Sequence, residues 1–444
     1  MKILMIGTGY VGLVTGACFA EIGHSVTCMD KDKGKIDRLN NGEIPIFEPG
    51  LEELVAHNRS IGKIRFIDSF DDLGENIPDF VFLAVGTPSH KLTGQADLSY
   101  LFIAAEEAAK KVSSLKGDGF SVFVTKSTVP VGTSLKVNEM IGKHLSADRF
   151  AVASNPEFLR EGAAIEDFMK PDRIVVGSDS EEARRMLEKM YRPLTRQGYP
   201  LVVTSTVATA ELIKYAANAF LATKITFINE LSRLCEKVDA RVDELSLGIG
   251  LDDRIGDKFL NPGPGYGGSC LPKDTLALIR TAVDFDSPLE IIETVVRAND
   301  RHKHLMVQKI RKAAGGSVEG KRIGILGLAF KAHTDDVRDS PALTIIPGLE
   351  QAGASIVAFD PEGINQARES LPHCEFADSA EQVFDNADLV VLVTEWPEFR
   401  TLDWPKLFKA MRKPVIVDLR NVLPHEELRE IGFTCHTAGG YVGN

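Results

Sequence analysis

Lys2-Ile3-Leu4-Met5-Ile6-Gly7-Thr8-Gly9-Tyr10-Val11-Gly12 is the stretch that decides the fold of this 444-residue chain. A short apolar run enters a G-x-G-x-x-G pattern, and a helical pattern follows. The three glycines permit a tight turn, a close approach of a pyrophosphate to the backbone, and tight packing of the helix on the strand. The phosphates then lie over the helix N-terminus. The stretch therefore predicts a strand-turn-helix unit that binds a dinucleotide.

Asp30 follows the next apolar run at about the distance expected for an acid that binds the adenosine ribose. Such a carboxylate favours NAD over NADP, because it would repel a 2′-phosphate. Lys31, next to it, slightly favours NADP. The simpler alternative is a glycine turn beside a solvated Asp, with no nucleotide bound. The context of strand, turn, helix and acid favours NAD.

Over residues 1–206, short apolar runs alternate with helical patterns. Strands are predicted at residues 3–6, 25–29, 80–85, 121–126, 150–153 and 173–177. Because these runs are rich in Val, Ile and Phe and do not alternate with polar residues, they indicate a buried parallel sheet. Repeated strand and helix predict a doubly wound α/β domain.

After Thr206 the pattern becomes helical. One uninterrupted helix of ~45 Å is predicted from Val207 to about Val238, and a second strand-helix block follows Gly315-Gly316-Ser317. Its strands are predicted at residues 322–326, 355–359, 389–394 and 415–419. We therefore expect an α/β protein in which two Rossmann-like doubly wound domains, 1–206 and 316–444, are joined by a central helical domain, 207–315.

Composition narrows the class of protein. A net charge of −12 argues against nucleic-acid binding. No apolar run reaches the ~18 residues that a membrane span needs, and the N-terminal stretch lacks the features of a signal peptide. The six cysteines are scattered, with no C-x-x-C pair, so neither a disulfide framework nor a metal site is expected. These features favour a cytoplasmic protein.

One cysteine stands apart from the other five, which we expect to be buried structural thiols. In Gly263-Pro264-Gly265-Tyr266-Gly267-Gly268-Ser269-Cys270-Leu271-Pro272-Lys273-Asp274, a glycine loop delivers Cys270 to a helix start that Pro272 favours. The helix dipole favours the thiolate there. Asp274 lies four residues on, on the same helix face. The segment predicts a nucleophile with a polar partner.

Other polar segments follow predicted strands, where ligands bind in such sheets. Val85-Gly86-Thr87-Pro88 and Lys126-Ser127-Thr128-Val129-Pro130 are two of them, and ordinary turn chemistry is the alternative. Asn155-Pro156-Glu157-Phe158-Leu159-Arg160-Glu161-Gly162 places two carboxylates around an arginine, in a site or on a solvated helix start. Lys214 and Asn218 are one helical turn apart, and this lysine either snorkels or sits desolvated in a site.

Gly324-Ile325-Leu326-Gly327-Leu328-Ala329-Phe330-Lys331 opens the second block like a dinucleotide loop that lacks its last glycine. It could bind a second nucleotide, with Lys331 on phosphate, or be a structural relic. Arg338 and Arg420 are further candidate anion ligands, although each alone is more often a surface charge.

Together these segments resemble the UDP-glucose/GDP-mannose dehydrogenase family over essentially the whole chain, and residues 264–274 are the most specific part. The resemblance implies an NAD domain, a helical dimerising middle and a C-terminal domain for the nucleotide of a sugar nucleotide. It also implies that a primary alcohol is oxidised to a carboxylate by two NAD in turn, with Cys270 forming a thiohemiacetal and then a thioester. UDP-glucose is the expected substrate and a homodimer or higher homo-oligomer the expected assembly, without nucleic acid or membrane partners.

The family motifs carry over to individual positions. The resemblance implies catalytic roles for Cys270, Lys214, Asn218, Asp274, Glu161 and Thr128, with the last three handling protons and positioning water. It implies contacts to NAD by Gly7, Gly9, Tyr10, Val11, Gly12, Asp30, Lys35, Thr87, Pro88, Ser89, Thr128, Glu161 and Arg338. It implies contacts to the UDP-sugar by Glu157, Phe158, Leu159, Arg160, Glu161, Lys214, Asn218, Arg254, Phe259, Leu260, Asn261, Pro262, Gly263, Gly267, Phe330, Lys331 and Arg420. Arg254 would reach the substrate of a neighbouring subunit, and Arg338 would make NAD contact both α/β domains.

Two alternatives stay open. A dehydrogenase of another nucleotide sugar, such as UDP-N-acetylmannosamine or GDP-mannose, would carry the same chemistry. A binding protein without catalysis is disfavoured by the intact Cys270, Lys214 and Asp274. Release of NADH with a panel of nucleotide sugars separates the three.

Overall fold

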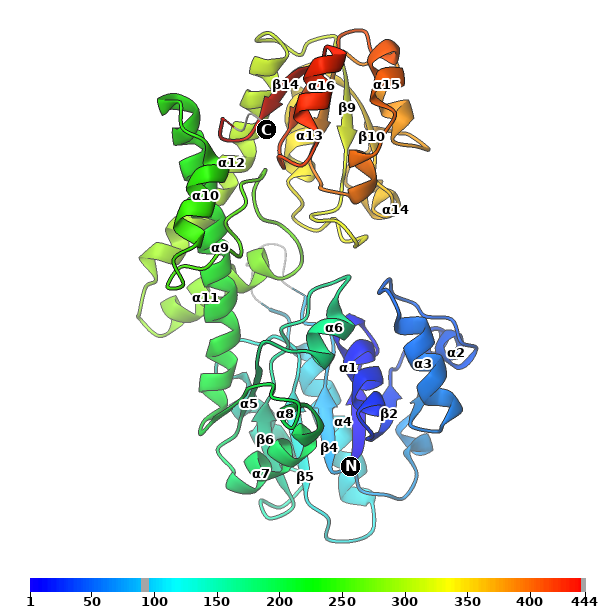
Figure 1. Cartoon of the computed structure of the whole chain (residues 1–444). Helices are drawn as coiled ribbons and strands as arrows, with labels where there is room; N and C mark the ends of the chain where they lie inside the picture. Colours follow the sequence, from blue (N-terminus) through cyan, green and yellow to red (C-terminus); the bar gives the residue numbers. More distant parts are fainter. Residues whose placement is uncertain (89–95, 441–444) are drawn as a thin grey trace. The chain divides into compact units, whose positions relative to one another are not determined.

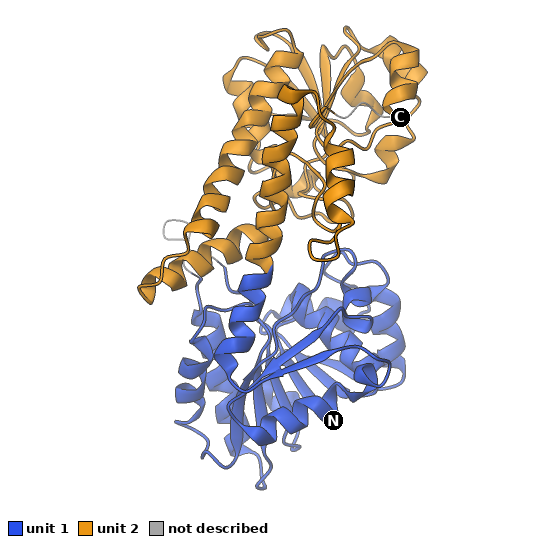
Figure 2. Ribbon diagram, turned by 60° about the vertical axis from the view of Figure 1, so that its left-hand side comes forward, with its two compact units in different colours: residues 1–217 blue, residues 218–444 orange. Residues whose placement is uncertain are grey.

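The computed structural model of the chain describes residues 1–88 and 96–440. The chain forms two compact units, Met1–Ala217 and Asn218–Asn444, which Figure 2 shows in different colours. The boundary falls inside the long helix α9 (Val207–Val238), whose 32 residues confirm the predicted helix. The finer division into domains 1–206, 207–315 and 316–444 is not tested by these units and stays a prediction.

Unit 1 is built on an eight-stranded sheet in the order β3-β2-β1-β4-β5-β6-β7-β8. Its strands are β1 (Lys2–Ile6), β2 (Ser25–Met29), β3 (Ile64–Ile67), β4 (Phe80–Leu83), β5 (Ser121–Thr125), β6 (Phe150–Ser154), β7 (Ile174–Gly177) and β8 (Leu201–Thr204). Its helices are α1 (Tyr10–Glu21), α2 (Lys33–Asn40), α3 (Leu51–Ser60), α4 (Ser99–Ser114), α5 (Thr133–Ile141), α6 (Ala164–Met169), α7 (Glu181–Met190) and α8 (Arg192–Thr195), with a 3₁₀ turn at η1 (Phe70–Leu73).

The sheet of unit 1 separates two apolar cores, which explains why its strands read as continuous apolar runs. Ile3 and Met5 pack in one core with residues of α1, whereas Leu4 and Ile6 pack in the other with residues of α4. Figure 1 labels the two helices and the sheet. Successive side chains of a strand point to opposite faces, so a sheet covered on both faces needs an apolar residue at every position.

The expectation of a wholly parallel sheet is wrong at one edge. β7 pairs antiparallel with β6 through Gly177 and Ser154, and β8 runs parallel to β7. An antiparallel connection leaves and re-enters the sheet at the same edge. The segment between these strands, which includes residues 155–162, therefore stays at the carboxyl edge of β6, where ligands bind in such sheets.

Unit 2 contains a six-stranded sheet, parallel throughout, in the order β11-β10-β9-β12-β13-β14. Its strands are β9 (Arg322–Leu326), β10 (Ser355–Phe359), β11 (Glu375–Phe376), β12 (Leu389–Leu392), β13 (Val415–Asp418) and β14 (Thr434–Thr437). Its helices after α9 are α10 (Val242–Gly250), α11 (Leu271–Asp284), α12 (Glu290–Ala313), α13 (Ala342–Gln351), α14 (Ile364–Ala367), α15 (Trp404–Ala410) and α16 (His425–Ile431), with 3₁₀ turns at η2 (Glu381–Phe384) and η3 (Pro397–Arg400). Numbered from its own first strand, this sheet has the order 3-2-1-4-5-6 of a Rossmann fold.

The predicted fold class is confirmed: Rossmann-like N- and C-terminal parts flank a helical region that contains one long helix. Within residues 1–88 and 96–440, no helix is long and apolar enough to cross a membrane. The same described residues hold no group of three His, Cys, Asp or Glu side chains that could bind a metal ion.

Candidate active site

The first glycine turn leaves open the place where a pyrophosphate would lie. Gly7 has a φ of 100°, and a Cβ there would lie 2.5 Å from the carbonyl O of Ala84. A Cβ on Gly12 would lie 2.0 Å from the carbonyl O of Gly7, whereas a Cβ on Gly9 would meet nothing within 4 Å. Gly9 is the N-cap of α1, so open backbone faces a helix N-terminus. This geometry fits a dinucleotide phosphate.

Asp30, the residue after β2, is held beside this turn. Its Oδ2 accepts hydrogen bonds from the backbone N–H and the hydroxyl of Thr8, both at 2.9 Å, and from Lys35 Nζ at 3.2 Å. Burial raises the pKa of Asp30, but these hydrogen bonds and the Lys35 charge outweigh it, so the pKa lies below its ordinary value. An ionised carboxylate at this position accepts hydrogen bonds from ribose hydroxyls and repels a 2′-phosphate, which fits NAD.

The loops after β4 and β5 bring two further predicted residues together. The Thr87 hydroxyl donates to the carbonyl O of Thr128 at 3.1 Å, and Ser127 Oγ donates to the carbonyl O of Val85 at 2.6 Å. Because the two strands are parallel neighbours, both loops leave the sheet at one edge. The predicted contact Ser89 lies outside the described residues.

Tyr10 contacts a residue that the sequence reasoning missed. Its hydroxyl hydrogen-bonds to Glu48 and accepts from the backbone N–H of Gly162 at 3.0 Å. Glu48 also accepts from the N–H groups of Gly162 and Ala164, both at 2.7 Å. The nearly buried Glu48 carboxylate therefore joins the start of α1 to the start of α6, directly after Glu161. Burial and the Glu48 charge raise the pKa of Tyr10, so its hydroxyl stays protonated.

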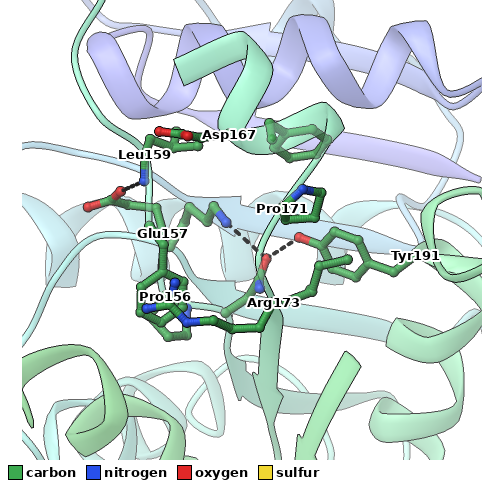
Figure 3. Close-up of a pocket in the computed structure, with 12 residues that line it drawn as sticks. Pro156, Glu157, Leu159, Asp167, Pro171, Arg173 and Tyr191 are labelled. Atoms are coloured by element: carbon green, nitrogen blue, oxygen red, sulfur yellow. Dashed lines mark hydrogen bonds between the residues drawn. The ribbon is translucent and has the colours of Figure 1, made fainter. Parts of the chain in front are cut away.

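Glu157 and Lys214 form a buried ion pair. Lys214 Nζ lies 3.0 Å from Glu157 Oε1, and each side chain is 5% exposed. Glu157 Oε2 accepts from the Leu159 N–H at 2.6 Å (Figure 3). Burial raises the pKa of Glu157, but the Lys214 charge and these hydrogen bonds hold it below its ordinary value. The ring of Phe158 faces Lys214, with the centroid 5.3 Å from Nζ.

A second buried lysine, Lys126, lies near this pair. Its Nζ donates to Asn155 Oδ1 at 3.2 Å, and the Tyr191 hydroxyl donates to the same oxygen (Figure 3). These side chains line a cavity of about 40 Å³ together with Glu157. Burial lowers the pKa of Lys126 to about 8, against the attraction of Glu157. The cluster thus places two lysines around one carboxylate.

Arg160 is engaged within unit 1. Its guanidinium contacts Asp167 Oδ1 at 2.6 Å and 3.1 Å, and its backbone N–H donates to Asp167 Oδ2 at 2.7 Å. These bonds fix the turn that carries Leu159 and Glu161, which are both half-buried. In this arrangement the guanidinium of Arg160 orders the loop.

Cys270 lies at the N-cap of α11, with Pro272 in the first turn, as the sequence predicts. Its side chain is half-buried, and Sγ lies 3.6 Å from Ser269 Oγ. Asp274, one turn further on, is fully buried. Its Oδ2 accepts from Asn218 Nδ2 at 2.6 Å, and its Oδ1 accepts from Lys273 Nζ at 2.8 Å. The carboxylate thus orients the Asn218 amide, and Asp274 itself lies one helical turn along α11 from Cys270.

The glycine loop before Cys270 packs closely against the loops of the second sheet. A Cβ on Gly263 would lie 3.2 Å from the Arg420 guanidinium, and a Cβ on Gly268 would lie 2.8 Å from the Phe330 ring. A Cβ on Gly267 would lie 2.4 Å from the carbonyl O of Asp339. Arg420 in turn donates to the carbonyl O of Phe330 at 3.0 Å. The structure therefore brings together Gly263, Gly267, Phe330 and Arg420, all predicted to contact the UDP-sugar.

The other predicted residues of unit 2 occupy varied surroundings. Phe259 has a φ of 67°, Leu260 and Pro262 are buried, and Asn261 is exposed. Lys331 Nζ lies 5.7 Å from the Phe330 ring centroid. Arg338 pairs with Asp336 at 2.8 Å, and Arg254, 88% exposed, pairs with Asp252 at 2.6 Å. The role of Arg254 at a neighbouring subunit stays a prediction.

Comparison with protein families gives three matches in chain order. The NAD binding domain of the UDP-glucose/GDP-mannose dehydrogenase family matches residues 1–195, its central domain matches residues 208–301, and its UDP binding domain matches residues 324–425.

Individual proteins match over nearly the whole chain. A UDP-glucose 6-dehydrogenase of Rhizobium meliloti is 52% identical over 443 residues, covering 99% of each chain. A structure of a UDP-glucose dehydrogenase from Pyrobaculum islandicum has a TM-score of 0.89 at 36% identity and covers 99% of this chain and 98% of that one. A UDP-D-ManNAc dehydrogenase from Pyrococcus horikoshii has a TM-score of 0.84 at 28% identity and covers 99% of each chain.

Proposed function

The chain belongs to the UDP-glucose/GDP-mannose dehydrogenase family, and we propose that it is the NAD-dependent UDP-glucose 6-dehydrogenase that its full-length relatives are named for. One observation carries the chemistry: the Cys270 thiol at the start of α11 lies one turn from a buried carboxylate that holds an amide. A helix N-terminus favours the thiolate, which is the nucleophilic form.

The reaction takes four electrons from C6 of the glucose unit and gives UDP-glucuronate. NAD, when bound at the first glycine turn, accepts a hydride in each of the two oxidations. The first oxidation also removes the hydroxyl proton and leaves an aldehyde. The Cys270 sulfur then bonds to the aldehyde carbon, giving a thiohemiacetal, which loses a hydride and a proton to become a thioester. Water cleaves the C–S bond and returns the thiol, and covalent capture keeps the aldehyde from escaping between the steps.

Charge that develops on the C6 oxygen needs donors in a site that excludes water. We assign this role to Lys214 and Asn218, which are one turn apart on α9 and nearly buried. Glu157 and Asp274 hold these two donors in place. Asp274, Glu161 and Thr128 are the groups that we assign to proton transfer and to the position of water.

In this proposal the first glycine turn binds NAD and the second lies at the UDP-sugar site. Residues 7–12, Asp30, Lys35, Thr87 and Thr128 hold NAD, as the open backbone at Gly9 supports. Gly263, Gly267, Phe330, Lys331 and Arg420 hold the UDP-sugar, which the packing of the glycine loop on Phe330 and Arg420 supports. The remaining predicted contacts, Arg254 and Arg338 included, stay part of the proposal.

The test is NADH release from a panel of nucleotide sugars that includes UDP-glucose, UDP-N-acetylmannosamine and GDP-mannose. We expect two NADH per UDP-glucose consumed and UDP-glucuronate as product. Turnover of UDP-N-acetylmannosamine with no turnover of UDP-glucose would overturn the substrate assignment. Binding of the sugars without NADH release would overturn the assignment as an enzyme.

We also propose that the protein is a homodimer or higher homo-oligomer. On α9 the apolar residues Phe220, Phe227 and Leu234 recur every seven positions and are 64%, 51% and 54% exposed. Such a repeat forms a helix-packing seam, and large apolar patches mark interaction surfaces. Light scattering should give at least twice 48.5 kDa, and Phe227→Glu should lower the mass.

A cytoplasmic location completes the proposal. All six cysteines are thiols in the structure, which fits a reducing compartment. Fractionation of cells that produce the chain tests the location.

A further inference from the structure

Two buried side chains hold the backbone of Gly263, one at its N–H and the other at its carbonyl. Asn229 Oδ1 accepts from the Gly263 N–H at 2.8 Å, and His302 Nε2 lies 2.8 Å from the Gly263 carbonyl O. Asn229 is 1% exposed and His302 is 2% exposed. Asn229 comes from α9 and His302 from α12, so two helices hold the two consecutive peptide groups that meet at Gly263.

The contacts of His302 select one form of its ring. A carbonyl oxygen only accepts hydrogen bonds, so Nε2 must carry the proton. On the other side of the ring, Arg233 Nη1 lies 2.7 Å from Nδ1. Because a guanidinium only donates hydrogen bonds, Nδ1 must be unprotonated and accept with its lone pair. The ring is therefore the neutral Nε2–H tautomer. Arg233 also donates to the carbonyl O of Asn229 at 3.2 Å, which ties the guanidinium to α9.

The electrostatic surroundings agree with a neutral ring. The pKa of His302 is lowered to about 4, chiefly by burial and also by the charges of Arg233 and Lys309, against the raising effects of the bond to Gly263 and of Glu236. A second proton, on Nδ1, would face the guanidinium. The ring therefore serves as a fixed donor at neutral pH.

The same face of α12 holds the backbone of a second residue of this loop. Asn299, one turn before His302, accepts from the Tyr266 N–H at 2.9 Å and donates to the Tyr266 carbonyl O at 3.1 Å. The loop between these two anchor points is short and contains Gly265 at a φ of 121°. The Gly263 carbonyl lies in the peptide to Pro264, which has no N–H, so a rotation of that peptide would leave the His302 Nε2–H without an acceptor. It would also disturb the loop where Gly263 packs against Arg420.

We propose that His302 is a positioning residue for the sugar nucleotide: its neutral Nε2–H tautomer, selected by Arg233, fixes the Gly263 carbonyl in the orientation that the loop needs to bind UDP-glucose. The inference rests on the proposed function, which places this loop on the UDP-sugar. His302 itself acts through Gly263 and touches no reacting atom in this scheme.

The test compares three variants of the full-length protein. His302→Phe removes the donor, His302→Gln restores an N–H donor, and His304→Gln changes a histidine of α12 that is exposed and bonds within its own helix. Calorimetry measures the Kd of UDP-glucose and of NAD separately. We expect His302→Phe to weaken UDP-glucose by about ten-fold, as for a buried group left without its partner, with NAD affinity within about two-fold. His302→Gln should recover most of the loss, and His304→Gln should match the wild type.

A second measurement uses the wild-type protein and does not depend on the folding of a variant. In two-bond ¹⁵N–¹H correlation spectra of protein with ¹⁵N-labelled histidine at pH 7, His302 should show a protonated Nε2 and an unprotonated Nδ1. The signal is assigned by its loss in His302→Gln.

The outcomes separate the inference from the proposed function. If the wild type does not bind UDP-glucose at all, the proposed function fails, whatever the tautomer. If it binds and His302→Phe binds as tightly, the positioning role is wrong. Equal loss of both ligands together with a lower Tm in His302→Phe assigns a purely structural role and also overturns the inference. A protonated Nδ1 in the wild type contradicts the tautomer on which it depends.

Discussion

The two sheets open on the same turn, yet only the first turn leads directly into a helix. Gly7 and Gly327 have φ values of 100° and 97°. Each donates its N–H at 2.8 Å to the last residue of the next strand, Met29 or Phe359. The resemblance between the two turns therefore extends to individual backbone hydrogen bonds.

The acids after those strands differ in what surrounds them. The Asp30 side chain is 15% exposed and lies beside the open backbone of Gly9. Asp360 is 1% exposed and accepts from the N–H groups of Leu328 and Ala329 and from the Trp396 indole. An acid enclosed in this way holds its own loop and cannot reach a ribose.

The helices after the two turns differ as well. α1 begins at Tyr10, directly after the first turn, whereas the first helix after Gly327 is α13, which begins at Ala342. A phosphate over the first turn meets a helix N-terminus, whereas the second turn leads into a loop that packs on residues 263–268. One strand order thus carries two turns with different surroundings, as the proposed division of NAD and UDP-sugar requires.

The largest expected effect tests whether the covalent step depends on Cys270, which lies outside both glycine turns. Cys270→Ser should lower kcat by a factor of roughly a thousand or more, because a serine hydroxyl is a far poorer nucleophile at neutral pH. Affinities for UDP-glucose and NAD should stay near those of the wild type, since Cys270 belongs to neither turn. Steady-state NADH release and calorimetry measure the two quantities. Near-normal production of UDP-glucuronate by the variant would remove the covalent assignment.

The two acids provide the sharpest contrast between the turns. Asp30→Ala should weaken NAD by about ten- to a hundred-fold, the equivalent of ~1.5–3 kcal/mol for a charge-assisted hydrogen bond, with little change for UDP-glucose. Asp360→Ala should instead lower the free energy of unfolding by ~3 kcal/mol or more, because several buried donors lose their acceptor. Calorimetry and urea unfolding of both variants give the comparison. An equal loss of NAD affinity in the two variants would mean that the two acids have the same role, and the contrast between the turns would be wrong.

Lys331→Ala should raise the KM for UDP-glucose by about three- to ten-fold, as expected for the loss of a half-buried point charge on phosphate. The KM for NAD should hardly change. Initial rates, with UDP-glucose and NAD varied in turn, give the two KM values. Lys321→Ala, at the residue before β9 in the same unit, is the control. A selective rise in the KM for NAD would reverse the assignment of the two turns.

Much of this comparison could be predicted from the sequence because its signals are local. Apolar runs at every position predicted strands buried on both faces, and the glycine spacing predicted the first turn. The edge strands β3, β8, β11 and β14 were missed because polar residues such as Arg65, Thr204 and His436 interrupt or end their apolar runs, and because β11 has only two residues. The direction of β7 was wrong because a run of residues does not show how it pairs.

Contacts between residues far apart in the sequence could not be predicted. Glu48 is 38 residues from Tyr10 and 114 from Gly162, and His302 is 39 residues from Gly263. No spacing rule links residues so far apart. Asp30 could be found because a known pattern fixes its distance from the glycines, whereas Glu48 belongs to no such pattern.

The smallest expected effect concerns the protonation of Asp30. Its pKa lies below the ordinary value because Thr8, Asp32 and Lys35 favour the ionised form over the opposing effect of burial. A group with a depressed pKa keeps its ionised contribution at all pH values above the ordinary pKa of ~3.9, and loses it as the pH falls through the lower, folded-state pKa. The ratio of the NAD dissociation constants of Asp30→Ala and wild type should therefore be the same, within about two-fold, at pH 8 and at pH 5. A ratio that falls toward one between those values would mean that Asp30 takes up a proton near neutrality, and the acid of the first turn would then be no better an acceptor for ribose than the enclosed acid of the second.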